Sequence, residues 1–142
     1  MLLILHRKGQ VGRKVFSAIV LLVAALAEAQ WLAVFYILES DAGYGLPKLA
    51  KLAVGGCLLY VLGCAVSLLR YRFGVVLGVV AAGLSWPHFA LLAASIPWRD
   101  FAWVLKSDVG GGPKIIALFG LLAATIWSLW QLPGVLRSRA KG

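Results

Sequence analysis

Four long runs of apolar residues dominate this sequence and limit the folds it can adopt. They cover residues 15–38, 52–69, 73–96 and 115–132. At a rise of about 1.5 Å per residue, a helix of roughly 18 to 24 residues crosses a membrane's hydrocarbon core, which is about 30 Å thick. Lipid cannot hydrogen-bond to exposed backbone groups, so runs of this length are helices and not strands. The sequence therefore predicts an all-α fold, a four-helix transmembrane bundle.

Composition agrees with this prediction and excludes a large soluble domain. Hydrophobic residues make up 62% of the 142 residues and charged residues only 13%, whereas about a quarter of the residues in soluble domains are charged. Once four spanning helices are assigned, almost nothing is left for a soluble catalytic domain. We therefore expect residues 1–142 to form a single transmembrane domain.

The first apolar run also resembles a signal peptide. Basic residues precede it, and Ala25, Leu26 and Ala27 look like a small-residue cleavage site. The run nevertheless continues to Leu38, so we expect an uncleaved first helix. Five apolar residues, MLLIL, stand before the basic cluster. We expect this segment either to lie in the membrane interface or to dock on a partner.

The distribution of Lys and Arg predicts the orientation of the bundle. With four helices, both termini share one side of the membrane with the connection between the second and third helices. That side carries nine Lys and Arg residues, against five on the other side. By the positive-inside rule both termini face the cytoplasm, and we expect a multi-pass protein of a prokaryotic inner membrane.

The formal net charge of +9 does not indicate nucleic acid as a partner. The basic residues are divided among short flanks of the apolar runs and form no clustered face or known nucleic-acid motif. Their attraction to anionic head groups makes membrane lipids the expected partners.

A short helix is expected at the outer membrane surface, over residues 97–107. Trp98, Phe101, Ala102 and Leu105 recur at the period of an amphipathic helix, and Pro97 suits its first position. The alternative is a plain loop with aromatic anchors. The expected interfacial anchors are Trp98, Phe101 and Trp103 on the outer side and Trp127 and Trp130 on the inner side.

Small residues recur every four positions in the third and fourth runs. Gly74 and Gly78 form one such set, and Gly120, Ala124 and Ser128 form the other. Small side chains at this spacing let two helices approach closely. The spacing does not decide whether these faces close the bundle or bind another subunit.

Glu28 is the residue that most suggests a function, because an acidic side chain near the middle of a spanning helix is costly. His88 lies at a similar depth on the third helix, directly after Pro87, which frees a backbone carbonyl. One hypothesis is a proton-sharing pair of Glu28 and His88 that lines a polar cavity, with Gln30 and Ser85 nearby. The alternative, which we favour, is a buried polar contact that holds the bundle together, because a single pair makes a poor transport pathway.

No metal site is predicted, and no cofactor. The acidic, histidine and cysteine residues are scattered and show no metal-binding spacing. Cys57 and Cys64 lie seven residues apart on one helix, about 10 Å along its axis, which is too far for a disulfide. His88 leaves one alternative, axial ligation of a tetrapyrrole, in which any second ligand comes from outside the chain.

These features favour a non-catalytic membrane subunit that anchors or stabilises a larger complex of integral membrane proteins. The alternative is a small transporter, channel or lipid-carrier-handling protein that acts as a homo-oligomer, with Glu28 and His88 as its polar centre. An intramembrane enzyme or a redox subunit that uses His88 has the least support, because the sequence carries no catalytic motif.

Overall fold

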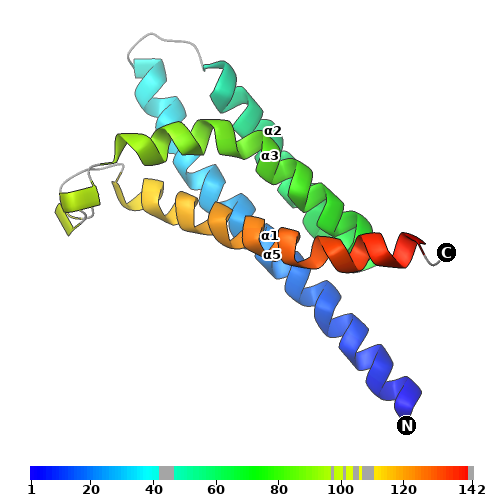
Figure 1. Ribbon diagram of the computed structural model, residues 1–142. Helices are drawn as coiled ribbons and strands as arrows, with labels where there is room; N and C mark the ends of the chain where they lie inside the picture. Colours follow the sequence, from blue (N-terminus) through cyan, green and yellow to red (C-terminus); the bar gives the residue numbers. More distant parts are fainter. Residues whose placement is uncertain (42–46, 97, 101, 104–105, 107–110, 141–142) are drawn as a thin grey trace.

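The computed structural model describes residues 1–41, 47–96, 98–100, 102–103, 106 and 111–140, without the side chains of residues 2, 6, 38–41 and 139. Four long helices and one short 3-10 helix are defined in this part of the chain, which contains no strand (Figure 1). They are α1 (Leu2–Asp41), α2 (Lys48–Leu69), α3 (Tyr71–Ser95), η1 (Trp98–Asp100) and α5 (Gly111–Ala140).

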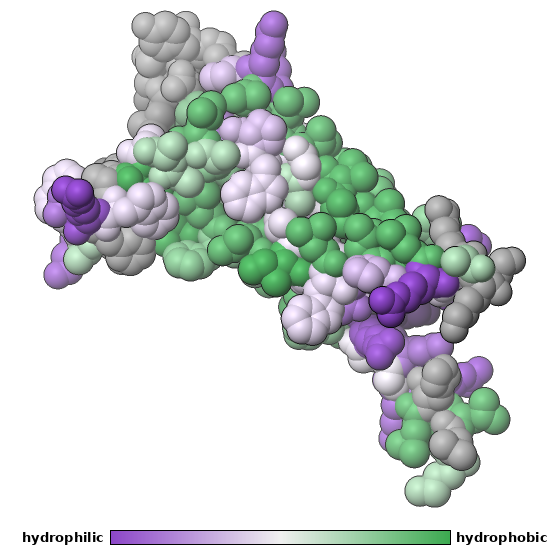
Figure 2. Space-filling view, viewed as in Figure 1, coloured by the Kyte–Doolittle hydropathy of each residue, from purple (hydrophilic) through white to green (hydrophobic). Residues whose placement is uncertain are grey.

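Each of the four long helices is long and apolar enough to cross a membrane. This confirms, for the described residues, the prediction of an all-α chain with four helices of that kind. In the view of Figure 2, apolar side chains cover the middle of the molecule and hydrophilic ones gather towards its ends.

The helices differ in extent from the apolar runs. α1 begins at Leu2 and not at residue 15, and α5 continues past Pro133 to Ala140. α3 ends at Ser95, one residue before the predicted end. Lys, Arg and Gln are good helix formers, so hydropathy locates the apolar part of a helix and misses its basic ends.

The bundle is built from antiparallel neighbours. α2 packs against α1 and α3, and α5 packs against α1 and α3. Only Arg70 separates α2 from α3; its backbone is extended, and its N–H donates to the Val66 carbonyl at 2.6 Å. This one-residue link makes α2 and α3 antiparallel neighbours.

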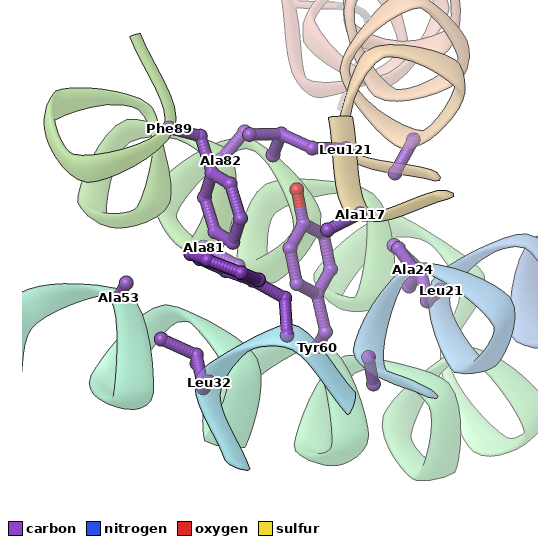
Figure 3. Close-up of a cluster of buried hydrophobic side chains, with 13 residues drawn as sticks. Leu21, Ala24, Leu32, Ala53, Tyr60, Ala81, Ala82, Phe89, Ala117 and Leu121 are labelled. Carbon is purple, nitrogen blue, oxygen red and sulfur yellow. The ribbon is translucent and has the colours of Figure 1, made fainter. Parts of the chain in front are cut away.

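The core is made mainly of small side chains with a few large ones between them. On α2 the buried residues recur every three or four positions, so one face of the helix packs inward. They are Ala50, Ala53, Gly56, Tyr60, Gly63 and Ser67. Figure 3 shows Tyr60 reaching into the centre beside Phe89, with its hydroxyl end near Leu121. All three of these side chains are fully buried.

α3 carries Pro87 inside the helix, and the helix changes direction along its length (Figure 1). Proline lacks the N–H that would bond to the carbonyl four residues earlier, and its ring crowds that carbonyl. A proline inside a helix is the usual cause of such a change of direction.

The first part of α1 projects away from the other helices (Figure 1). We call residues 1–13 the α1 extension. All of its described side chains are exposed, and the first fully buried residue of α1 is Ser17. Met1 and Leu3 are the most exposed apolar side chains of the extension, at 97% and 84%.

Of the outer helix predicted over residues 97–107, the structure describes only 98–100, 102–103 and 106, and the other residues lie outside the described part of the chain. Within that range the structure defines η1, and Trp103 is helical. The indole N–H of Trp98 donates to the Ala93 carbonyl at 2.9 Å, which ties η1 to the end of α3. Phe101, predicted as an anchor, falls outside the described residues.

Candidate functional site

Glu28 lies on α1 and is completely buried. Its Oε2 accepts a hydrogen bond of 2.9 Å from the hydroxyl of Ser85 on α3, which is also completely buried. The other carboxyl oxygen, Oε1, has no hydrogen-bond partner. Glu28 therefore forms a polar contact between two helices that are far apart in the sequence.

A glycine on α2 leaves the room for this contact. A Cβ added at Gly56 would lie 2.3 Å from the Ser85 hydroxyl oxygen and 2.8 Å from the Ala81 carbonyl oxygen. Real Cβ atoms do not approach other atoms so closely, so any larger residue displaces Ser85. Next to Gly56, the Cys57 thiol donates to the Ala25 carbonyl at 3.3 Å, one turn before Glu28. The contact thus sits where α1, α2 and α3 meet.

His88 has a different partner. The indole N–H of Trp31 donates to Nε2 of His88 at 3.3 Å, and the rings of Phe35 and Phe89 meet His88 edge to face. Lys114 Nζ lies 5.4 Å from the centre of the Trp31 ring, in a cation–π contact. His88 is therefore enclosed by aromatic side chains.

The hypothesis of a Glu28–His88 pair is corrected by these contacts. Glu28 bonds to Ser85 and His88 bonds to Trp31, and both bonds join residues 57 positions apart. A Cβ at Gly78 would lie 3.0 Å from Leu21, again 57 positions away. α1 and α3 therefore run parallel in a constant register, which we call the α1–α3 seam. A Glu28–His88 pair would join residues 60 positions apart. That differs from the observed register of 57 by three residues, which is almost one helical turn.

Gln30 takes no part in this seam. It is half-buried on α1, two residues beyond Glu28, whereas Glu28 bonds to Ser85 and His88 bonds to Trp31. Two residues correspond to about 200° around a helix, so the two side chains leave α1 in nearly opposite directions.

The small residues predicted to allow close approach all meet another helix of the same chain. A Cβ at Gly74 would strike Ser67 of α2, one at Gly78 would lie 2.6 Å from Ser128 Oγ of α5, and one at Gly120 would lie 2.6 Å from Ala27 Cβ of α1. Ala124 and Ser128 are themselves buried. The sequence left open whether these faces close the bundle or bind another subunit. The observed contacts lie within one chain and close the bundle.

The tryptophans predicted as anchors have different surroundings. Trp98, Trp103 and Trp130 are exposed, at 50%, 64% and 78%. Trp127 is half-buried, and its ring packs edge to face on Phe16 of α1 at 4.7 Å. Trp127 is thus also a helix-packing residue.

Comparisons with protein-family models, with curated proteins and with solved structures find no match for this chain.

The arrangement of these side chains limits the chemistry that the seam can perform. In the part of the chain that the structure describes, His, Cys, Asp and Glu do not gather in groups of three or more. Nε2 of His88 already accepts the Trp31 N–H, so a tetrapyrrole iron would have to displace Trp31 to bind that nitrogen. The seam suits a specific interhelical contact in which Glu28 sets the register of α1 against α3.

Sequence reasoning found Glu28, Ser85 and His88 but missed Trp31 and Gly56. Trp31 lies three residues beyond Glu28, as His88 lies three beyond Ser85, so the same helical spacing on both segments could have indicated two parallel contacts. Gly56 stands beside Gly55 in the sequence. Hydropathy treats the two glycines alike, although Gly56 is buried in close contact with α3, whereas an added Cβ at Gly55 would meet only Leu84, at 4.0 Å.

Proposed function

We propose that this chain is a non-catalytic integral membrane subunit, which anchors or stabilises a larger complex of membrane proteins and docks on it through the α1 extension. The observation that carries the proposal is the exposed apolar tip of that extension. Met1, Leu3, Ile4 and Leu5 are exposed by 59% to 97%.

The length of α1 supports docking over burial of this tip in the lipid. Its 40 residues correspond to about 60 Å, roughly twice the thickness of a hydrocarbon core. The part from Lys14 onwards packs in the bundle, so the extension reaches about 20 Å beyond it. The polar interface of a membrane is thinner than that, and a straight α1 places its apolar tip in water.

Burial of this tip against a protein removes apolar surface from water, which contributes about 25 cal/mol per Å². Arg7 and Lys8 follow the tip and are exposed. A partner that fits both features offers an apolar groove with acidic residues at one end, the usual way in which a single helix is bound.

The alternative function is a small oligomeric transporter, channel or lipid-carrier-handling protein. One observation favours it, because the buried Glu28 has an oxygen without a partner, and such residues mark ion or substrate pathways in membranes. Against it, Glu28 is completely buried and does not line the large cavity described below.

Purification in mild detergent tests the proposal. The tagged chain is isolated from its native membrane, and the proteins that accompany it are identified and quantified by mass spectrometry. Two variants are compared with the wild type: a polar one, with Leu3→Ser, Ile4→Ser and Leu5→Ser, and an apolar control, with Leu3→Met, Ile4→Leu and Leu5→Met.

We expect the wild type and the apolar control to recover the same larger membrane proteins in stoichiometric amounts, and the polar variant to lose them while it still reaches the membrane. Recovery of the chain alone, or only with copies of itself, would contradict the subunit proposal and favour the oligomeric transporter.

A further inference from the structure

A cavity of about 530 Å³ lies at the end of the bundle that carries both chain termini. It opens where α1, the connection between α2 and α3, and the last part of α5 come together. Neither Glu28 nor any other residue of the α1–α3 seam lines it, so it is a separate feature of the molecule.

Four basic residues line this cavity, and no Asp or Glu lies among its described lining residues. They are Arg13 and Lys14 of α1, Arg70 of the connection and Arg72 of α3. Like charges held around one space repel each other, and the repulsion is stronger beside apolar helices than in open water. An anion in the cavity relieves that repulsion.

Neighbouring groups hold part of this basic lining in place. The Lys14 ammonium donates to the Leu69 carbonyl at 3.3 Å, at the end of α2. Tyr71 also lines the cavity, and its hydroxyl donates to Gln131 Oε1 of α5. These contacts join α1 to α2 and α3 to α5, so all four long helices help to hold the cavity wall together.

The rest of the lining suits an amphiphilic ligand. Leu69, Phe73 and Val135 add apolar surface beside the basic groups, and the Arg70 guanidinium lies 5.9 Å from the centre of the Phe73 ring. Arginine presents a planar set of N–H donors that matches the oxygens of a phosphate. Basic pockets between helix ends are the usual sites for anionic lipid head groups.

We propose that this cavity binds a phosphate-bearing anion, held by Arg13, Lys14, Arg70 and Arg72. Two sources carry this chemistry: an anionic phospholipid of the surrounding leaflet, whose chains would lie along the apolar residues, and soluble phosphate. The site does not depend on the proposed partner complex, because every residue in it belongs to this chain.

Native mass spectrometry of the full-length chain in detergent measures the binding. The ligands are phosphatidylglycerol, phosphatidylcholine and inorganic phosphate. The test variant carries Arg13→Gln and Arg72→Gln. The control carries Lys48→Gln and Lys51→Gln, which remove the same charge from exposed residues at the other end of α2.

A second variant blocks the cavity without a change of charge. Gly134 lines the cavity, and a Cβ added there meets no atom within 4 Å. Gly134→Leu therefore fills part of the space, and leucine also favours the helix over glycine. This variant keeps the test valid if the loss of two arginines disturbs the fold.

We expect wild type to bind phosphatidylglycerol about tenfold or more tightly than the Arg13→Gln and Arg72→Gln variant does, since each basic residue near an anionic lipid adds to binding. Gly134→Leu should weaken binding as well, and the Lys48→Gln and Lys51→Gln control should not.

Displacement of the lipid by millimolar inorganic phosphate would identify soluble phosphate as the ligand, and no displacement would identify the lipid. Equal loss in both charge variants, or equal affinity for phosphatidylcholine, would overturn the proposal.

Discussion

At the scale of single residues, the contact between Glu28 and Ser85 depends on the absence of a side chain at Gly56. The height of Glu28 along its helix could be predicted from the sequence, because each residue adds about 1.5 Å along a helix. The partner of Glu28 could not, because Ser85 and His88 are one turn apart on nearly the same face of α3. Only the register of α1 against α3 decides between them.

Replacement of Gly56 by alanine should destabilise the bundle by about 1–3 kcal/mol, because the new methyl group collides with Ser85 and with the backbone of α3. Gly55→Ala is the matched control, since its Cβ meets only a leucine methyl group at 4.0 Å. It should be neutral or stabilise the protein by up to about 1 kcal/mol. Unfolding of the purified protein in increasing sodium dodecyl sulfate measures both. Equal losses for the two variants would show that Gly56 does not face Ser85.

Ser85→Ala removes the hydrogen-bond donor to Glu28 and should cost about 0.6–1.5 kcal/mol. Glu28→Gln keeps an amide oxygen that can accept the same hydrogen bond. It should therefore lower the free energy of unfolding by less than Ser85→Ala does. The same unfolding assay compares them. A larger loss for Glu28→Gln would mean that the carboxyl group has a role beyond accepting the bond from Ser85.

At the scale of helices, the structure shows which helix packs against each small residue, which the sequence did not determine. The spacing of Gly120, Ala124 and Ser128 predicts a close approach but not the helix that approaches. Which helix it is depends on the order of the helices around the bundle, and no local pattern encodes that order. The structure places Gly120 against Ala27 of α1.

A disulfide between introduced cysteines tests this approach of α1 and α5. With Cys57 and Cys64 replaced by alanine, the pair Ala27→Cys and Gly120→Cys should cross-link on mild oxidation. An added Cβ at Gly120 lies 2.6 Å from the Ala27 Cβ, so a separation of the two helices by about 1 Å gives the roughly 3.5–4.5 Å Cβ spacing of a disulfide. The pair Ala27→Cys and Phe119→Cys should not, since Phe119 is 59% exposed. Electrophoresis without reductant reports the product. A cross-linked dimer in place of a compact monomer would show that this face joins two subunits.

At the scale of the whole molecule, the four long apolar helices were predictable because the length of an apolar run alone indicates them. The helix ends were not, because basic residues extend α1 and α5 without any apolar signal. The α1 extension is the clearest case: its apolar tip is separated from the first apolar run by basic residues, and only the continuous helix shows how far it reaches.

The excess of Lys and Arg near the termini predicts that both ends and the Arg70 connection face the cytoplasm. Single cysteines in a chain without Cys57 and Cys64 test this. Gly9→Cys and Arg137→Cys should resist a membrane-impermeant maleimide in intact cells and react after lysis. Lys48→Cys and Arg99→Cys should react in intact cells. The reverse pattern would invert the orientation and place the basic cavity on the outer side.

The measurement that tests the central claim most directly is photo-cross-linking in living cells from the tip of the α1 extension. A photoreactive amino acid is placed at Ile4, and as a control at Leu58, an exposed residue of α2 in the apolar part of the bundle. If the tip docks on a partner, we expect one discrete adduct with a larger membrane protein from position 4, identified by mass spectrometry, and no such adduct from position 58. Cross-links from position 4 only to lipid or to a second copy of the chain would contradict this expectation.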